Sequence, residues 1–302
     1  MVRKVLFRLA IAGAFVVAAG SRAGASPRAP VRPTPSRAEV DSLGGRSGKL
    51  RARIVSPKRG GPIRILQELF GDSAFGRPGV YTTADSTSGR PFSFITLLPF
   101  QSRERGRLGN YRMGFWPGER NHSLSDSKRP DGFIEVTAEN QDTPVSEHFR
   151  LRDFLTHDQP NVWPKYLVLR EELIDKLELL ISDLQTRGVA VNRMTVMSGF
   201  RSPQYNAQGV GRRGGRARDS RHQYGDAADV VVDNNDDGRM DDLNGDGRSD
   251  VRDARVVMES LERIELAYPE LVGGAGLYRA TRAHGPFVHV DVRGARARWG
   301  RS

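Results

Sequence analysis

Cysteine is absent from the sequence, and lysine is scarce. Without cysteine, the 302-residue chain has no disulfide framework, no thiolate metal ligand and no cysteine nucleophile. Any transition metal must therefore be held by histidine and carboxylate groups. Only 6 of the 47 basic residues are lysine, and the arginines are spread along the whole chain. Because basic residues and aromatics do not cluster together, the formal charge of +11 indicates a solvated basic surface and not a nucleic-acid groove.

Long apolar runs are also missing, apart from a short one near the N-terminus. Arg3 and Lys4 precede the 12-residue apolar run 9–20, and Ala23-Gly24-Ala25 has the spacing of a cleavage site. Such a run is too short to cross a bilayer, which takes about 20 residues. We therefore expect residues 1–25 to be a signal peptide. The mature chain is then periplasmic or otherwise extracytoplasmic, and it has no membrane span.

The rest of the chain divides by composition. Residues 26–50 are rich in Pro, Arg, Ser and Gly, which predicts a disordered linker. Residues 51–145 contain short β-type runs separated by turn signals, which predict a small β-rich accessory domain with strands near 80–83, 92–97, 111–115 and 132–136. Helical periodicity follows in residues 146–302, where an apolar stripe begins at 149–155 and a second one over 173–184 predicts a helix that ends by Gly188.

Two segments of this C-terminal half bring histidines and carboxylates together. His222 and Asp229 flank a stretch of small residues that allows close backbone packing. In the segment 287–292 the residues alternate, so that His289 and Asp291 point to the same face of a strand. Two histidines and a carboxylate match a catalytic zinc site, in which the fourth position is left for water. Taken singly, each histidine has an alternative reading as a hydrogen-bonded or surface residue.

A specific pattern then connects these residues to a known family. The pattern S-x-H-x-x-G-x-A-x-D over 220–229, followed by His289, resembles the zinc D-Ala-D-Ala peptidases, the M15 family. The lead-in 198–203 and the pair Arg298-Trp299 are most similar to exported murein endopeptidases within that family. The resemblance covers about residues 146–300. It implies an α+β fold shared with the Hedgehog signalling domain, with an antiparallel sheet and helices.

The resemblance also implies roles for individual residues. His222, Asp229 and His289 are expected to bind zinc. Arg201 is expected to hold a substrate carboxylate or amide, and Ser220 to support the site.

The general base is where this chain departs from the family. Many members carry Glu or Asp three residues before the last zinc ligand, whereas this chain has Pro286. Asp291 is the candidate for this task, and its alternative role is to orient a zinc ligand. His284 on the preceding loop is a further catalytic candidate, as a group that stabilises the oxyanion.

An acidic insertion, residues 233–253, separates the expected zinc ligands. It has oxygen ligands at positions 1, 3, 5, 9 and 12 of a calcium loop, with Gly at position 6, and a helical run follows it, as in half of an EF-hand. These candidate calcium ligands are Asp242, Asn244, Asp246, Asp250 and Asp253. An overlapping repeat suggests a second ion, with the ligands Asp233, Asn235, Asp237 and Asp241. The alternative reading is an acidic turn. Structural Ca²⁺ in this insertion would fix the relative placement of the zinc ligands.

The sequence therefore predicts an exported zinc peptidase whose partner is peptidoglycan. Its expected reaction is hydrolysis of stem or cross-link peptides, as a carboxypeptidase or an endopeptidase. Two alternatives are kept. The first is a non-catalytic wall-binding module of the same fold, which Pro286 favours. The second is a calcium-dependent scaffold or adhesion protein.

Overall fold

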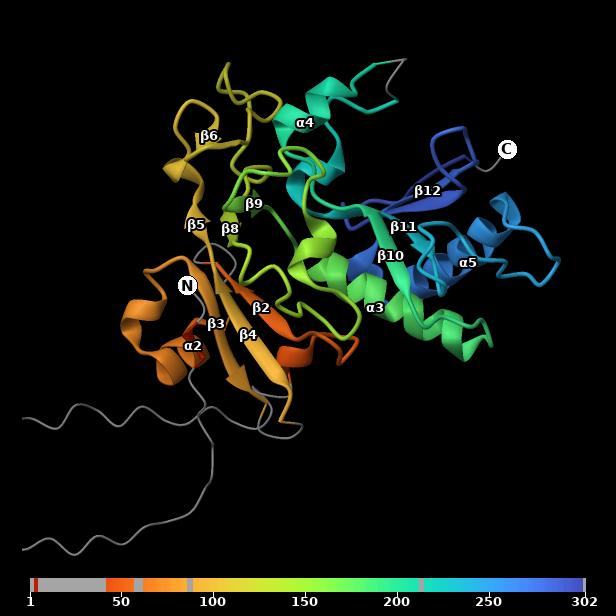
Figure 1. Cartoon of the computed structure of the whole chain (residues 1–302), viewed down its shortest axis with the longest axis horizontal. Coiled ribbons are helices and arrows are strands. Elements are labelled where there is room, and N and C mark those ends of the chain that lie inside the picture. Colours follow the sequence, from red (N-terminus) through yellow and green to blue (C-terminus); the bar gives the residue numbers. More distant parts are fainter. Residues whose placement is uncertain (1–2, 5–41, 57–61, 86–88, 212–214, 301–302) are drawn as a thin grey trace, which may run out of the picture.

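The computed structural model describes residues 3–4, 42–56, 62–85, 89–211 and 215–300 (Figure 1). The predicted signal peptide, apart from Arg3 and Lys4, and the predicted linker up to residue 41 lie outside these ranges. Residues 42–50 differ from the predicted linker, because they contain the 3-10 helix η1 (Ser42–Gly44) and bury Leu43 and Leu50 in apolar clusters.

A four-stranded sheet forms the N-terminal part of the described structure. Its order is β1-β3-β4-β2, in which β3 and β4 are antiparallel and the outer strands run parallel to their neighbours. Helix α2 (Ile63–Phe70) and the 3-10 helix η2 (Asp72–Ala74) follow β2, and Leu66 of α2 shares a cluster with Phe94. The strands are β1 (Arg3–Lys4), β2 (Ala52–Val55), β3 (Gly79–Ala84) and β4 (Pro91–Thr96).

Short strands connect this sheet to the C-terminal half. The sheet β5-β8-β9 is antiparallel, and β6 and β7 form a small hairpin. Because β9 lies beyond the predicted boundary at residue 145 and pairs with β8, backbone hydrogen bonds cross that boundary. The elements are β5 (Leu98–Pro99), η3 (Phe100–Ser102), β6 (Arg107–Leu108), β7 (Tyr111–Arg112), β8 (Gly132–Val136) and β9 (Lys165–Leu167).

The C-terminal half is built on a five-stranded sheet of order β10-β11-β13-β12-β14. It is antiparallel except that β14 runs parallel to β12. Helices α3 and α5 pack against each other, and α5 packs against β12 and β13. This architecture confirms the α+β class. The elements are η4 (Leu151–Phe154), α3 (Glu171–Thr186), β10 (Met194–Ser198), α4 (Pro203–Gln208), η5 (Arg221–Tyr224), β11 (Ala227–Val232), α5 (Val251–Ala267), η6 (Pro269–Leu271), β12 (Gly274–Tyr278), β13 (Phe287–Asp291) and β14 (Ala297–Trp299).

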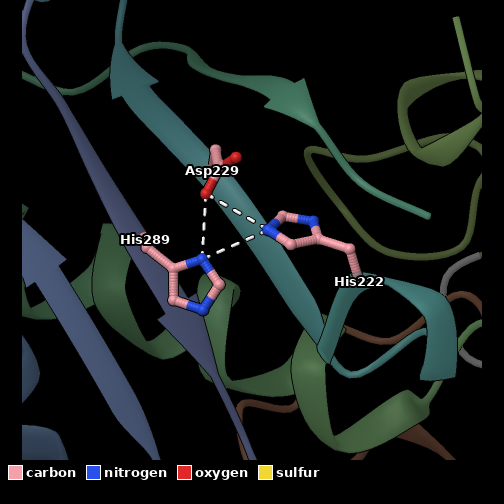
Figure 2. A group of neighbouring side chains, drawn as sticks. All are labelled: His222, Asp229 and His289. Atoms are coloured by element: carbon pink, nitrogen blue, oxygen red, sulfur yellow. Dashed lines mark hydrogen bonds and ion pairs between the residues drawn. The ribbon is translucent and has the colours of Figure 1, made fainter. Parts of the chain in front are cut away.

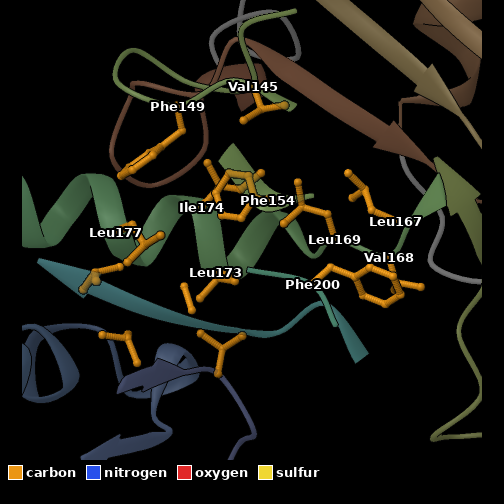
Figure 3. Packing of buried hydrophobic residues seen from close by; sticks show 14 of the residues in the cluster. Val145, Phe149, Phe154, Leu167, Val168, Leu169, Leu173, Ile174, Leu177 and Phe200 are labelled. Atoms are coloured by element: carbon orange, nitrogen blue, oxygen red, sulfur yellow. The ribbon is translucent and has the colours of Figure 1, made fainter. Parts of the chain in front are cut away.

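Helix α3 is the central packing element. Its apolar residues recur at three- and four-residue spacing, so that Leu173, Ile174 and Leu177 lie on one face and contact the buried cluster that includes Phe154 and Phe200 (Figure 3). The earlier apolar stripe at 149–155 forms only the 3-10 helix η4. None of the helices in the described ranges is long and apolar enough to cross a membrane.

A buried lysine ties this helix to the strands of the site. Lys176 is fully buried, and its ammonium donates to Glu265 Oε1 (2.7 Å) and to the carbonyls of Leu271 and Asp291 (2.9 Å each). These partners use all of its donors, which offsets the cost of burying the charge. Arg298 also pairs with Glu265. Lys176 therefore joins helix α3 to helix α5 and to the last residue of strand β13.

Candidate metal centre

Three side chains from separate segments meet on one face of the five-stranded sheet. Asp229 on β11 lies directly opposite His289 on β13 in the strand register, and His222 reaches them from η5 (Figure 2). All three are buried. In the described part of the chain, they are the one group of three or more His, Asp or Glu residues whose ligand atoms all lie within 4.8 Å of one another.

The separations between these atoms fit a tetrahedral ion. His222 Nε2 lies 3.2 Å from His289 Nδ1 and 3.3 Å from Asp229 Oδ1, and His289 Nδ1 lies 2.9 Å from the same oxygen. Ligands bound at the usual zinc distances to a tetrahedral ion are about 3.3 Å apart. Two nitrogens and one oxygen are also a donor set that zinc accepts. The arrangement is therefore a possible metal site, as the sequence predicts.

The remaining nitrogen of each histidine ring is held by a hydrogen bond. His222 Nδ1 lies 2.8 Å from the carbonyl of Gly199, so it donates there and leaves Nε2 with a free lone pair. His289 Nε2 lies 3.1 Å from Asp291 Oδ2, which leaves Nδ1 to face Asp229. Such contacts fix both the tautomer and the orientation of a ligating ring.

Asp291 lies behind His289, on the side away from Asp229. It is fully buried, and its Oδ1 accepts from the backbone amides of Gly274 (2.7 Å) and Arg293 (3.1 Å). Burial alone raises the pKa of Asp291, but hydrogen bonds from His289 and from the guanidinium of Arg293 outweigh it and hold the pKa well below its usual range. A carboxylate so placed orients the ring, which supports the second of the two roles considered for it.

Arg201 contacts the metal-ligand group directly. Its Nη2 donates to Asp229 Oδ2 and its Nε donates to Ser198 Oγ (2.8 Å). Asp229 thus has one oxygen paired with a cation and the other facing the two histidines. Burial raises the pKa of Asp229, but the neighbouring His222 and His289 outweigh it and lower the pKa well below its usual value.

Two other predicted residues take less central positions. Ser220 precedes η5, and its carbonyl accepts from the amide of Gln223 at 3.1 Å, so that it helps to shape the turn that carries His222. His284 lies on the loop before β13, with its Nδ1 2.7 Å from the carbonyl of Gly285 and its ring centroid 4.9 Å from that of Phe287. It is not part of the metal-ligand group.

One family of known proteins matches the segment that carries part of this site. Residues 165–244 match the model of a family described as peptidoglycan L,D-endopeptidase MepK. This segment resembles the M15 peptidoglycan endopeptidases. It contains His222 and Asp229 and ends before His289. The resemblance predicted from the sequence is confirmed. No curated protein and no solved structure matches the chain.

The glycine in the matched motif has a clear steric reason. Gly225 ends η5 with φ of 67°, a left-handed conformation. A Cβ atom at this position would lie 2.2 Å from the carbonyl oxygen of Val168. The chain therefore needs glycine here to turn from His222 into the strand that carries Asp229.

Sequence reasoning assigned no role to an aromatic residue beside His289. The Trp299 ring centroid lies 5.1 Å from that of His289, and its Nε1 donates to the hydroxyl of Tyr278 at 3.1 Å. Gly276 is opposite both His289 and Trp299 in the strand register, and a Cβ there would lie 2.1 Å from Trp299 Nε1. The sequence does contain a signal for this contact. Glycines in a strand, as in the run 273–276, mark places where neighbouring groups approach closely.

The two acidic loops form similar turns. The Asp242 carboxylate accepts from the amide of Gly247 (2.7 Å), as Asp233 does from that of Gly238 (3.1 Å). Asp253 is fully buried and accepts from the backbone amides of Leu243 in the loop and of Asp250 at the start of α5. Within the described residues, neither loop brings three His, Asp or Glu ligand atoms as close together as the site at His222, Asp229 and His289 does. Calcium loops also use amide and backbone oxygens, so calcium binding stays a prediction.

Proposed function

We propose that the chain is an extracytoplasmic zinc peptidase that hydrolyses peptide bonds in peptidoglycan. The observation that carries this proposal is the set of three buried donor atoms, His222 Nε2, Asp229 Oδ1 and His289 Nδ1, spaced 2.9–3.3 Å apart. The family match over residues 165–244 supports the substrate class.

Each residue of the site then has a distinct task. His222, Asp229 and His289 would hold the ion. When bound, zinc supplies a water of lowered pKa and polarises a carbonyl oxygen. Asp291 holds the His289 ring in its ligating tautomer. Arg201 donates through Nε to Ser198 and through Nη2 to Asp229, which leaves its Nη1 as the donor that would position a substrate carboxylate or amide.

The family description supports one of the two expected activities. The matched family is described as an L,D-endopeptidase, which supports cleavage within a cross-link over removal of a terminal residue. We therefore favour the endopeptidase among the two peptidase activities that the sequence predicts.

The test is digestion of purified peptidoglycan with and without a zinc chelator, followed by mass analysis of the released muropeptides. We expect products that disappear on chelation, return with added Zn²⁺ and are absent for His222→Ala. His122→Asn is the matched control, because His122 is exposed, has φ of 59° and lies outside the metal-ligand group. Tight binding to the wall polymer without products under any metal condition would contradict the proposal and favour the wall-binding alternative.

A further inference from the structure

An open groove lies next to the segment that carries Arg201. It has a volume of about 760 Å³ and borders α4, which starts two residues after Arg201. This volume lies in the range of about 300–1,000 Å³ that is typical of ligand sites. Its lining is rich in arginine and includes Arg105, Arg107, Arg112, Arg120, Phe115 and Gln204.

The four arginines carry uncompensated charge. All four are exposed, and in the described ranges no carboxylate lies within ion-pair distance of any of them. The neighbouring buried guanidinium of Arg103 is paired with Glu119. A concave surface lined by charge of one sign attracts ligands of the opposite sign. The groove is therefore suited to an anionic ligand.

Guanidinium groups pack against the aromatic side of the groove. The Arg120 guanidinium lies 4.2 Å from the ring centroid of Phe115, and that of Arg103 lies 4.9 Å from the centroid of Trp116. Such contacts hold a guanidinium over a ring. Arg105 has φ of 48°, which non-glycine residues adopt only rarely.

Two hydrogen bonds join this wall to the metal centre. The Gln204 amide donates to the carbonyl of Met113 (3.0 Å), and Trp116 Nε1 donates to the carbonyl of Gln223 (2.9 Å), the residue after His222. A Cβ on Gly114 would lie 2.5 Å from the Gln204 amide nitrogen, so the two backbones are in direct contact. The groove is fixed in position relative to the proposed zinc ligands.

We propose that this groove is a second substrate subsite, which binds the carboxylates of peptidoglycan peptides next to the bond at the metal centre. The inference rests on the proposed function. Most of the groove comes from residues 105–121, outside the segment that matches the family. Guanidinium groups pair with carboxylates in a bidentate manner and with phosphates equally well. The hydrogen bonds that join the groove wall to the segments of the metal centre favour the carboxylates of the peptide over a separate phosphate polymer of the wall.

The test measures binding of the full chain to sedimented peptidoglycan at low temperature, so that it does not depend on turnover. Two variants remove positive charge from the groove. The double variant carries Arg107→Gln and Arg112→Gln, and the fourfold variant adds Arg105→Gln and Arg120→Gln. The matched control is Arg255→Gln with Arg263→Gln on α5, which lies far from β6 in Figure 1. We expect the fourfold variant to bind about tenfold more weakly, with a reduced dependence on salt, because exposed ion pairs add modestly and are screened. The control should change binding less than about twofold.

Two preparations of peptidoglycan identify the anion. Binding should persist on material stripped of phosphate polymers and should fall on material whose carboxylates have been converted to amides. Equal binding by wild type and groove variants, or a loss seen only when phosphate polymers are present, would overturn the inference. Wild-type protein that binds through the groove but releases no muropeptides would refute the peptidase proposal separately.

Discussion

Replacing Asp291 by Asn separates the two roles that the sequence leaves for this residue. The side chain keeps its size, but the hydrogen-bond partners of the Asp291 carboxylate are all donors: His289 Nε2, the backbone amides of Gly274 and Arg293, and the Arg293 guanidinium. An Asn must turn its own NH₂ group toward one of these donors. The hydrogen bond that holds the His289 ring is weakened, while the ligand atoms themselves are unchanged.

The magnitude follows from this position. Loss of a group that orients a metal ligand typically weakens metal affinity by about 10–100-fold. This corresponds to about 1.4–2.7 kcal/mol. Loss of a general base instead lowers kcat by about 10²–10⁴-fold even when the metal site is full. The two roles therefore predict opposite patterns.

The assay measures zinc affinity by competition with a chromophoric chelator, and turnover of a soluble cross-linked muropeptide at saturating zinc. For Asp291→Asn we expect weaker zinc binding and a kcat within a few-fold of wild type. Asp175→Asn is the control, because Asp175 is also buried and accepts from the amides of Arg46 (2.7 Å) and Ser47 (2.9 Å) instead of a metal ligand. Unchanged zinc affinity with a kcat lowered 100-fold or more would refute the orienting role.

Three further substitutions test the surrounding structure. Lys176→Met removes the ammonium that donates to Glu265 and to two buried carbonyls. It should lower stability by about 3 kcal/mol and the Tm by roughly 6–12 °C, whereas a shift under about 2 °C would contradict the buried network. Burial raises the pKa of Glu262, but hydrogen bonds from Arg298 and a second arginine outweigh it and lower the pKa to about 2. The stabilisation that ionised Glu262 gives the fold is therefore full above the unfolded pKa of 4.5 and is lost as the pH falls toward 2. The urea midpoints at about pH 5 and about pH 2.5 should differ less in Glu262→Gln than in wild type. An unaltered difference would argue against the lowered pKa. Gly276→Ala should displace the Trp299 ring and lower stability by about 1–3 kcal/mol. A changed near-ultraviolet circular dichroism spectrum would show the displacement of the ring, and an unchanged one would disprove it.

Local patterns in the sequence predict much of the fold and the ligand set. The three- and four-residue spacing predicts a helix over 173–184, and α3 spans Glu171–Thr186. Strand alternation predicts that His289 and Asp291 share a face, and a hydrogen bond of 3.1 Å joins them. Both patterns are short-range, since they depend only on the geometry of one element.

Contacts between distant segments account for what the sequence does not predict. The pairing of Arg201 with Asp229 spans 28 residues, and the bond from Trp116 to Gln223 spans 107. Pairing of β8 with β9 likewise crosses the predicted domain boundary. No local periodicity encodes such partners. The sequence therefore predicts a substrate contact for Arg201 but not its pairing with Asp229, and the spacing of the groove arginines gives no signal.

The strand register that places Asp229 opposite His289 also governs when an ion can bind. These residues are 60 positions apart in the chain, and their atoms come within 2.9 Å only once β11 and β13 have paired. An ion held by this centre binds the folded chain and not the unfolded one. Once the ion exceeds its dissociation constant, each tenfold rise in its free concentration adds about 1.4 kcal/mol to the stability of the fold. The supply of metal in the surroundings thus becomes a variable that sets the fraction of the chain that is folded at equilibrium.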